Sequence, residues 1–373
     1  MNSSRRYTAK TLLFYIIAGI IFITFLSVLL AEIWPWGSDF LFYYYPLAEK
    51  WLDGNRDIYN PNVSALFYPP WSLFVIVPLG LLPIRLAHGF QLSLSFVAII
   101  ISIRLLKDSK TFPKYFYILS LINLHSFDLY IRGQLDAIVL FGIALGYWAI
   151  QNRKPVWLSL GFCLMVMKPP LNVILVLVLF LIAIRYWSKK ELFITFLAPV
   201  VMVIISSLAI GIDWPIKYIK NMTPTIDYLS ISIWKITDMI GLSRWIVGIV
   251  ACLAVYRFLR EAMQHNLSFY TLSLALSTTF CFTVYANGDH YVLLIPAFLY
   301  VLGESFPLGI MAFLVTLTPL LRLLWGSNLS SIDLIYPILL LSSTYYLMKK
   351  EESVNLNDVS ELSQNNAMNT DIF

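Results

Sequence analysis

Charged residues are scarce in this sequence. They make up only 13% of the 373 residues, whereas hydrophobic residues make up 59%. Ordinary soluble domains carry about 25% charged residues and about 45–50% apolar ones. The chain therefore lacks the polar surface of a water-soluble body of its size, which argues against a soluble enzyme, a nucleic-acid-binding protein and a disordered scaffold. The composition predicts a polytopic membrane protein.

Cysteine is scarce as well. The three cysteines, Cys163, Cys252 and Cys281, all lie in apolar runs and show neither paired positions nor the spacing of metal ligands. The sequence thus indicates no disulfide framework and no zinc site. We predict that the protein uses no metal and no other cofactor.

The apolar runs predict the membrane topology. About thirteen runs approach the length that crosses a bilayer, and the basic residues at positions 5–10 place the N-terminus in the cytoplasm. If every run crossed, the basic clusters at 104–114 and 185–190 would lie outside. The run 69–84 is short and carries four prolines, which kink helices and remove backbone donors. We therefore expect it not to cross, and predict an all-α fold with about twelve transmembrane helices and both termini cytoplasmic.

The polar segments divide the chain further. We expect one transmembrane domain over residues 1–348, whose first outer loop, 32–85, holds interfacial and re-entrant segments. Residues 349–373 are polar and lack a periodic apolar face. They are typical of a disordered tail, which this topology places in the cytoplasm.

The first outer loop holds the first candidate site residue. Residues 40–53 predict an amphipathic helix that lies on the membrane, with Gly54 just beyond its end. Its aromatic side chains, Tyr44 among them, are also typical of a simple interfacial anchor. Asp39 differs from them, because it lies one or two turns beyond the first span, where its carboxylate can reach a cavity at the membrane edge.

Ionisable residues also collect at the outer ends of later spans. Arg132, Gln134 and Asp136 form a polar group at the mouth of an apolar helix, a pattern that a salt-bridged helix start shares. Lys168 is a lone cation between two apolar runs. Charged residues at this depth are costly and indicate a function, although a lysine at a helix end also snorkels to the interface.

A further pair, Asp289 and His290, lies between two late spans. A lone histidine is often structural, but one beside an aspartate at an outer helix end can donate to an anion. All these groups share the outer side, which suits an enzyme that takes a lipid-linked phosphate donor from the membrane. Asp39 would act as general base on a hydroxyl acceptor. The cations would stabilise the departing lipid phosphate.

Three stretches of the chain carry a resemblance to a known family. They are Asp39-Phe40 to Tyr44, continuing through Gly54 and Tyr59 to Phe67-Tyr68-Pro69-Pro70; Gly133-Gln134; and Met167-Lys168-Pro169. In these residues the chain resembles the GT-C superfamily of polyprenyl-phosphate-sugar-dependent glycosyltransferases. It is most similar to glycosyltransferase family 87, the polyprenol-phosphate-mannose-dependent α-mannosyltransferases, also called domain of unknown function 2029. The resemblance covers about residues 30–190.

The resemblance implies a fold, a reaction and a set of site residues. It implies a multi-spanning helical protein with an extracytoplasmic active site and with membrane-lying helices in the first outer loop. The enzyme would transfer a hexose, most often mannose, with inversion from an undecaprenyl- or dolichyl-phosphate donor to a glycolipid or glycan, usually without a metal or nucleotide sugar. Asp39 would be the catalytic base. We assign the donor phosphate to Arg132, Lys168 and His290, and substrate binding to Tyr44, Tyr68, Gln134, Asp136 and Asp289.

One departure and two alternatives stay open. Many relatives have Asn where this chain has Asp136, which affects sugar identity and the acceptor site. A transporter or lipid flippase would use the same polar residues as a path, but it would spread them through the middles of the spans. A polymerase or ligase acting on an undecaprenyl-diphosphate glycan would place key arginines in a large late outer loop, and the late loops here are short.

Overall fold

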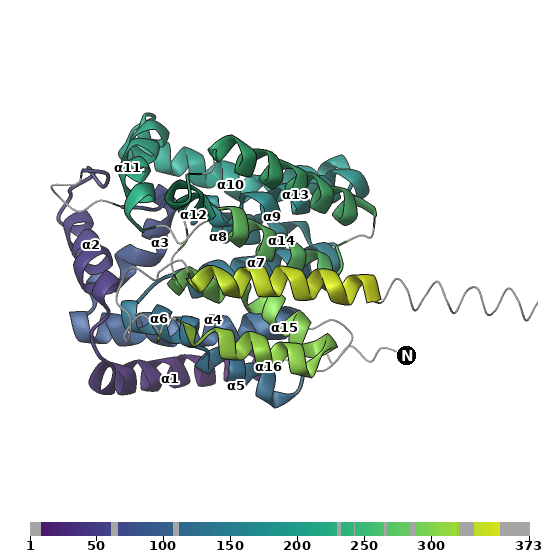
Figure 1. Ribbon diagram of the computed structural model, residues 1–373. Helices are drawn as coiled ribbons and strands as arrows, with labels where there is room; N and C mark the ends of the chain where they lie inside the picture. The colour runs from purple at the N-terminus through teal and green to yellow at the C-terminus, as the bar shows by residue number, and fades with distance from the viewer. Residues whose placement is uncertain are drawn as a thin grey trace, which may run out of the picture.

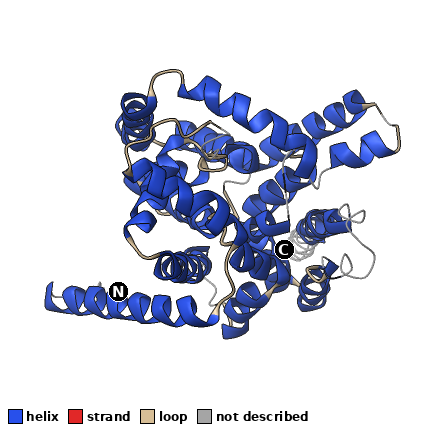
Figure 2. Ribbon diagram, turned by 90° about the vertical axis from the view of Figure 1, so that its left-hand side faces the viewer, coloured by secondary structure: helices blue, strands red, loops and turns tan. Residues whose placement is uncertain are grey.

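The described part of the chain is helical. The computed structural model describes residues 9–60, 66–106, 112–229, 233–241, 243–264, 267–283, 286, 288–318, 320 and 332–350. Across these residues the chain forms helices and loops and no strand, as Figure 2 shows. The predicted all-α fold class is thereby confirmed. Most of the predicted tail, residues 351–373, lies outside the described residues.

Four described helices are long and apolar enough to cross a membrane. They are α1 (Ala9–Ile33), α4 (Ile84–Leu106), α9 (Pro169–Tyr186) and α10 (Lys189–Ile210). Their lengths follow from unbroken runs of aliphatic and aromatic residues, and their charged residues lie near their ends. These helices support a membrane protein. The cytoplasmic position of the termini stays a prediction.

Most of the other described helices are shorter than a membrane span, apart from one of 21 residues over 244–264. The helices of the first two thirds of the chain are α5 (Lys114–Ile122), α6 (Leu124–Arg132), α7 (Asp136–Gln151), α8 (Pro155–Met165) and α11 (Trp214–Leu229). The later ones are α12 (Ile233–Met239), α13 (Arg244–Gln264), α14 (Phe269–Phe282), the 3₁₀ helix η4 (Gly288–Leu294), α15 (Ile295–Glu304), α16 (Phe306–Val315) and a last helix over 335–350. An 11-residue helix such as α8 spans only about 16 Å, whereas the hydrocarbon core is about 30 Å thick. The number of twelve spans therefore stays a prediction.

One apolar run of the sequence divides into two helices. Residues 114–130 form α5 and the start of α6, because Asn123 takes an extended conformation with φ −63° and ψ 151°. Its side-chain oxygen accepts a hydrogen bond from the Ser126 amide, which caps the N-terminus of α6. Apolar residues on both sides conceal this break, although the polar His125, Ser126 and Asp128 follow Asn123.

The described residues between α1 and α4 form only short helices. The predicted amphipathic helix forms as the π-helix η1 (Phe40–Tyr44) followed by α2 (Tyr45–Leu52), and Gly54 beyond its end has a positive φ of 91°. The proline-rich run breaks into η2 (Pro70–Ser72), α3 (Leu73–Ile76) and η3 (Val77–Leu81). This interruption agrees with the expectation that residues 69–84 do not form one spanning helix. Helices α2, α3 and α11 gather at the left end of the molecule in Figure 1.

Helix α7 occupies the middle of the molecule and carries the first residues of the site. Most of its side chains are buried, and it packs against α4, α8, α9 and η4. Its first residue, Asp136, is fully buried. The N-terminus of α9, the end of α6 and η4 reach the same region.

Helices α1 and α4 pack closely through a glycine. A Cβ atom at Gly89 would collide with the Ser27 carbonyl oxygen and would lie 2.8 Å from the Ala31 nitrogen. The Ser27 and Ser93 hydroxyls hydrogen-bond across the same contact at 3.2 Å. Small residues allow such close approach between helices in a membrane.

We predict that Gly89→Val lowers stability by about 1–3 kcal/mol, because the added side chain forces α1 away from α4. The thermal unfolding midpoint in detergent measures the effect. Gly19→Val is the matched control, since nothing lies within 4 Å of a Cβ atom at that position of α1. An equal loss of stability in both variants would contradict the packing account.

Candidate functional site

A tight turn between α6 and α7 brings three polar residues together. Helix α6 ends at Arg132, and Gly133 follows in the left-handed conformation with φ 69°. Glycine favours this conformation because it lacks a Cβ atom, and a Cβ here would also lie 2.7 Å from that of Phe40. The chain then passes through Gln134 and enters α7 at Asp136. The turn therefore places these polar residues beside the loop between α1 and α4.

The Gln134 side chain connects the loop to the helices. Its Nε2 donates a hydrogen bond to Asp39 Oδ2. Its Oε1 accepts from the Tyr44 hydroxyl at 2.7 Å and from the Tyr68 hydroxyl at 3.0 Å, and the two hydroxyls lie 2.6 Å apart. Lys168 Nζ lies 3.4 Å from the same oxygen. One carboxamide therefore joins a carboxylate, two phenols and an ammonium group.

Lys168 is a buried cation at the start of α9. Its side chain is only 5% exposed, and Nζ lies 2.7 Å from Asp136 Oδ2 and 3.1 Å from His290 Nδ1. Nζ also lies 5.2 Å from the centre of the Tyr68 ring. Two prolines follow Lys168 in the first turn of α9, where their missing N–H groups cost nothing. The ammonium group is thus paired and held at the mouth of an apolar helix.

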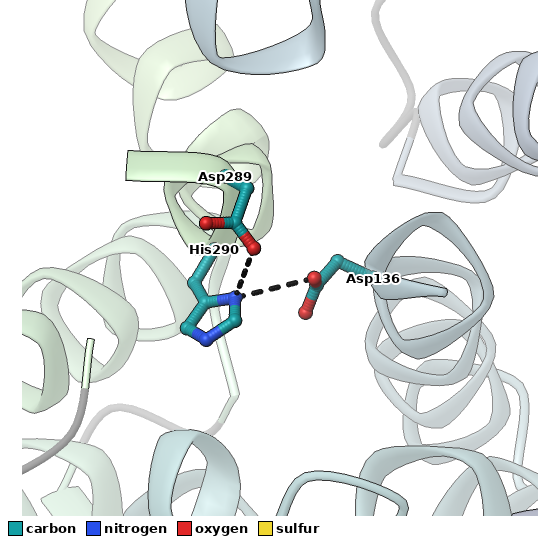
Figure 3. Close-up of side chains that lie close together, drawn as sticks. All are labelled: Asp136, Asp289 and His290. Atoms are coloured by element: carbon teal, nitrogen blue, oxygen red, sulfur yellow. Dashed lines mark hydrogen bonds and ion pairs between the residues drawn. The ribbon is translucent and has the colours of Figure 1, made fainter. Parts of the chain in front are cut away.

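Asp289 and His290 reach the cluster from η4. His290 Nδ1 lies 3.2 Å from Asp136 Oδ2 and 2.9 Å from Asp289 Oδ2 (Figure 3). Asp289 Oδ1 lies 3.8 Å from Arg132 Nε. Two buried carboxylates thus face one imidazole, an ammonium group and a guanidinium group.

All nine predicted site residues lie in one connected network of hydrogen bonds and ion pairs. The chain of contacts runs from Asp39, Tyr44 and Tyr68 through Gln134 to Lys168, and from there through Asp136 and His290 to Asp289 and Arg132. The residues come from the first loop, the turn before α7, the start of α9 and η4. Their chemical roles stay predictions.

Sequence reasoning missed two further acids. Asp128 pairs with Arg132 at 2.9 Å, and its spacing of four residues on α6 is the available signal. Asp333 is fully buried and stands in an apolar run as its only acid. A Cβ atom at Gly288 would lie 3.4 Å from Asp128 Oδ2 and 3.6 Å from Asp333 Oδ2, so both acids border the start of η4.

Asp39 accepts a hydrogen bond from Gln134, and it is more accessible than the fully buried Asp136 and Asp289. It lies outside the long helices and is half-buried. Burial raises the pKa of its carboxyl group, and the nearby Asp289 charge adds to the rise; Arg132, Gln134 and Lys168 oppose it. A raised pKa makes a carboxylate a better proton acceptor, provided that it stays ionised at the working pH.

Three of these side chains are of the types that bind metal ions. Ligand atoms of Asp136, Asp289 and His290 all lie within 4.8 Å of one another. Lys168 Nζ lies against two of the same residues, so an ammonium group already stands beside these atoms.

We predict that Lys168→Met destabilises the protein by about 3–5 kcal/mol, because it leaves the buried Asp136 carboxylate without its cation. Chemical or thermal unfolding in detergent measures the loss. The double variant Lys168→Met with Asp136→Leu should recover much of it, since both buried charges are then absent. Additive losses in the double variant would contradict the pairing.

The comparisons with known proteins identify the family. The family model described as glycosyltransferase family 87 matches residues 66–302. No curated protein and no solved structure matches the chain. The matched segment contains Tyr68 and the cluster from Arg132 to His290, and it begins after Asp39 and Tyr44. The chain belongs to glycosyltransferase family 87 and is a glycosyltransferase, which uses a sugar donor and an acceptor.

Proposed function

We propose that this family 87 enzyme transfers a hexose, with mannose as the first candidate, from a polyprenyl-phosphate donor to a hydroxyl group. The acceptor would be a glycolipid or a glycan on the extracytoplasmic face. The observation that carries the proposal is the continuous path from the Asp39 carboxylate through Gln134 to the Lys168 ammonium group. It provides a proton acceptor and an anion-stabilising cation at the two ends of one amide.

In the proposed step, the Asp39 carboxylate and the Lys168 ammonium group act at the same time. Asp39 takes the proton of the acceptor hydroxyl while that oxygen attacks C1 of the sugar. The bond between C1 and the phosphate oxygen breaks, and the lipid phosphate leaves with the electron pair. Attack from the face opposite the leaving group inverts the anomeric carbon.

The cations suit the leaving group. Lys168, Arg132 and His290 lie within one cluster, and negative charge develops on the phosphate as the bond breaks. Fixed positive groups in a site of low dielectric constant stabilise such charge more strongly than they would in water. Lys168 is the main candidate for stabilising the leaving phosphate, because it is the more buried of the two permanent cations, Lys168 and Arg132.

The remaining predicted residues suit the polar parts of the substrates. Tyr44 and Tyr68 present hydroxyls beside Gln134, and they are the residues through which we propose that the first loop contacts donor or acceptor. Asp136 and Asp289 are engaged with cations. We propose that they orient Lys168 and Arg132 and limit the space for the sugar.

The charge distribution supports an extracytoplasmic site. Helix α9 carries Arg185 in its last turn and α10 begins with Lys189 and Lys190, whereas the opposite end of α9 faces the cluster. Basic residues favour the cytoplasmic side, so the site is expected on the other side. An extracytoplasmic site is consistent with a multi-pass protein whose termini are both cytoplasmic.

A transporter or flippase is the second candidate. It would need polar groups along a path through the membrane. The charged residues of the four long described helices lie near their ends, and the network joins helix ends and loops instead. This distribution favours an enzyme.

Asp39→Asn should reduce transfer from radiolabelled polyprenyl-phosphate mannose by about 10²–10⁴-fold, the contribution typical of a general base. Donor binding should persist, because the amide keeps the shape of the carboxylate. Membrane vesicles that carry the protein allow both measurements. Asp53→Asn is the control, an exposed acid of the same loop. Full transfer by the Asp39 variant would exclude it as the base.

Gln134→Leu should move the acidic limb of the pH profile of kcat/KM to higher pH. The substitution removes a hydrogen bond that holds the Asp39 pKa down, so the pKa rises. Because Asp39 must be ionised to accept a proton, activity is then lost at a higher pH as the solution is acidified. Gln91→Leu is the control, since Gln91 contacts only the Gln134 backbone oxygen among these groups. An unmoved limb, or the same shift in the control, would contradict the role of Gln134.

A further inference from the structure

The groups drawn in Figure 3 have the composition of a divalent-metal site. Asp136, Asp289 and His290 each offer one ligand atom, these atoms lie within 4.8 Å of one another, and all three side chains are buried. Carboxylate oxygens and imidazole nitrogens together bind zinc and manganese in many proteins. The cluster also lies where the proposed reaction develops negative charge, so the source of positive charge at this point matters for the mechanism.

The spacing of the ligand atoms fits a small cation. His290 Nδ1 lies 3.2 Å from Asp136 Oδ2 and 2.9 Å from Asp289 Oδ2. Two neighbouring ligands on an octahedral ion, each about 2.1 Å from the metal, are about 3.0 Å apart. His290 Nδ1 therefore lies from each of the two carboxylate oxygens at the spacing of neighbouring ligands on such an ion.

Lys168 places its ammonium group against the same atoms. Nζ lies 2.7 Å from Asp136 Oδ2, 3.1 Å from His290 Nδ1 and 3.4 Å from Gln134 Oε1. An ammonium group has three hydrogens and no acceptor, so Asp136 Oδ2 and Gln134 Oε1 accept from it, and His290 Nδ1 lies in contact with it. A metal ion bound to Asp136 and His290 would lie in direct contact with this positive group.

Both buried carboxylates of this group already have a cationic neighbour. The two buried carboxylates, Asp136 and Asp289, face two permanent cations, Lys168 at 2.7 Å and Arg132 at 3.8 Å. A divalent ion would add two positive charges to this buried region. Its charge would repel the ammonium group that lies against the same ligand atoms, so the ammonium group and a metal ion would compete for one place.

We propose that Lys168 is the resident cation of a metal-type site. Its ammonium group takes the place of a divalent ion between Asp136 and His290, and transfer in the native enzyme proceeds on this cation. Removal of the ammonium group uncovers a site that binds a divalent metal. The catalytic part of this inference rests on the proposed function, whereas the binding part depends only on the geometry.

Manganese binding tests the inference without any transfer assay. Titration of Mn²⁺ into purified protein, followed by electron paramagnetic resonance of the free ion, should show no saturable site in the wild type. Lys168→Ala should bind one Mn²⁺ per chain. The double variant Lys168→Ala with Asp136→Asn should bind it at least tenfold more weakly, because it loses a ligand carboxylate.

The unfolding midpoint gives a second measurement, which applies even when Lys168→Ala is less stable than the wild type. Mn²⁺ should raise the unfolding midpoint of Lys168→Ala and leave that of the wild type unchanged, because a ligand that binds only the folded state stabilises it. If Lys168→Ala binds Mn²⁺ no better than the wild type in either measurement, the latent site does not exist. Saturable binding to the wild type would show that Lys168 does not exclude the metal.

Chelation tests the catalytic part separately. Excess EDTA should leave wild-type transfer from polyprenyl-phosphate mannose unchanged. Loss of transfer that Mn²⁺ or Mg²⁺ restores would overturn the role of Lys168 as the resident cation. Absence of transfer with and without EDTA would instead contradict the proposed function, while the manganese titrations would still test the site.

Discussion

A buried ammonium group requires compensation, and this requirement organises the site. Lys168 is 5% exposed, and an unpaired charge in such a place would cost several kcal/mol. Asp136 supplies the opposite charge, and His290 and Gln134 supply further polar atoms. These partners belong to α7, η4 and the turn between α6 and α7. The convergence of four chain segments on one nitrogen therefore follows from the burial of that nitrogen.

The same requirement extends through Gln134 to the loop that follows α1. Its amide oxygen faces Lys168 and the two tyrosine hydroxyls, and its amide nitrogen donates to Asp39. Donors that converge on the oxygen polarise the amide and strengthen the hydrogen bond that its nitrogen donates. The position and the acidity of Asp39 thus depend on a cation in another part of the fold, which links the proposed base to the proposed leaving-group site.

Much of the site could be predicted from the sequence because of one geometric constraint. Polar residues at the ends of apolar helices on one membrane face have little space in which to lie, so grouping them by side also groups them in three dimensions. This reasoning found Asp39, Lys168 and His290, although 251 positions separate the first from the last. It did not give their pairings, because Lys168 meets Asp136 and His290 only through tertiary packing.

The missed features have physical reasons as well. Asp128 resembles an ordinary i,i+4 partner of Arg132, and Asp333 gave no signal beyond its isolation in an apolar run. The break at Asn123 had a sequence signal, since the polar His125, Ser126 and Asp128 follow it, but the cap that defines the break is a local hydrogen bond. The proline-rich run 69–84 was predictable, because each proline removes a backbone donor whatever the tertiary context.

Donor discrimination tests the central claim most directly. Purified membranes that carry the wild-type protein would be given, in parallel, radiolabelled mannose, glucose and arabinose linked to polyprenyl phosphate, and mannose linked to a nucleoside diphosphate. The account predicts transfer from a polyprenyl-phosphate hexose, mannose foremost, and none from the nucleotide sugar. Transfer from the nucleotide sugar in membranes free of lipid-linked sugar would contradict it.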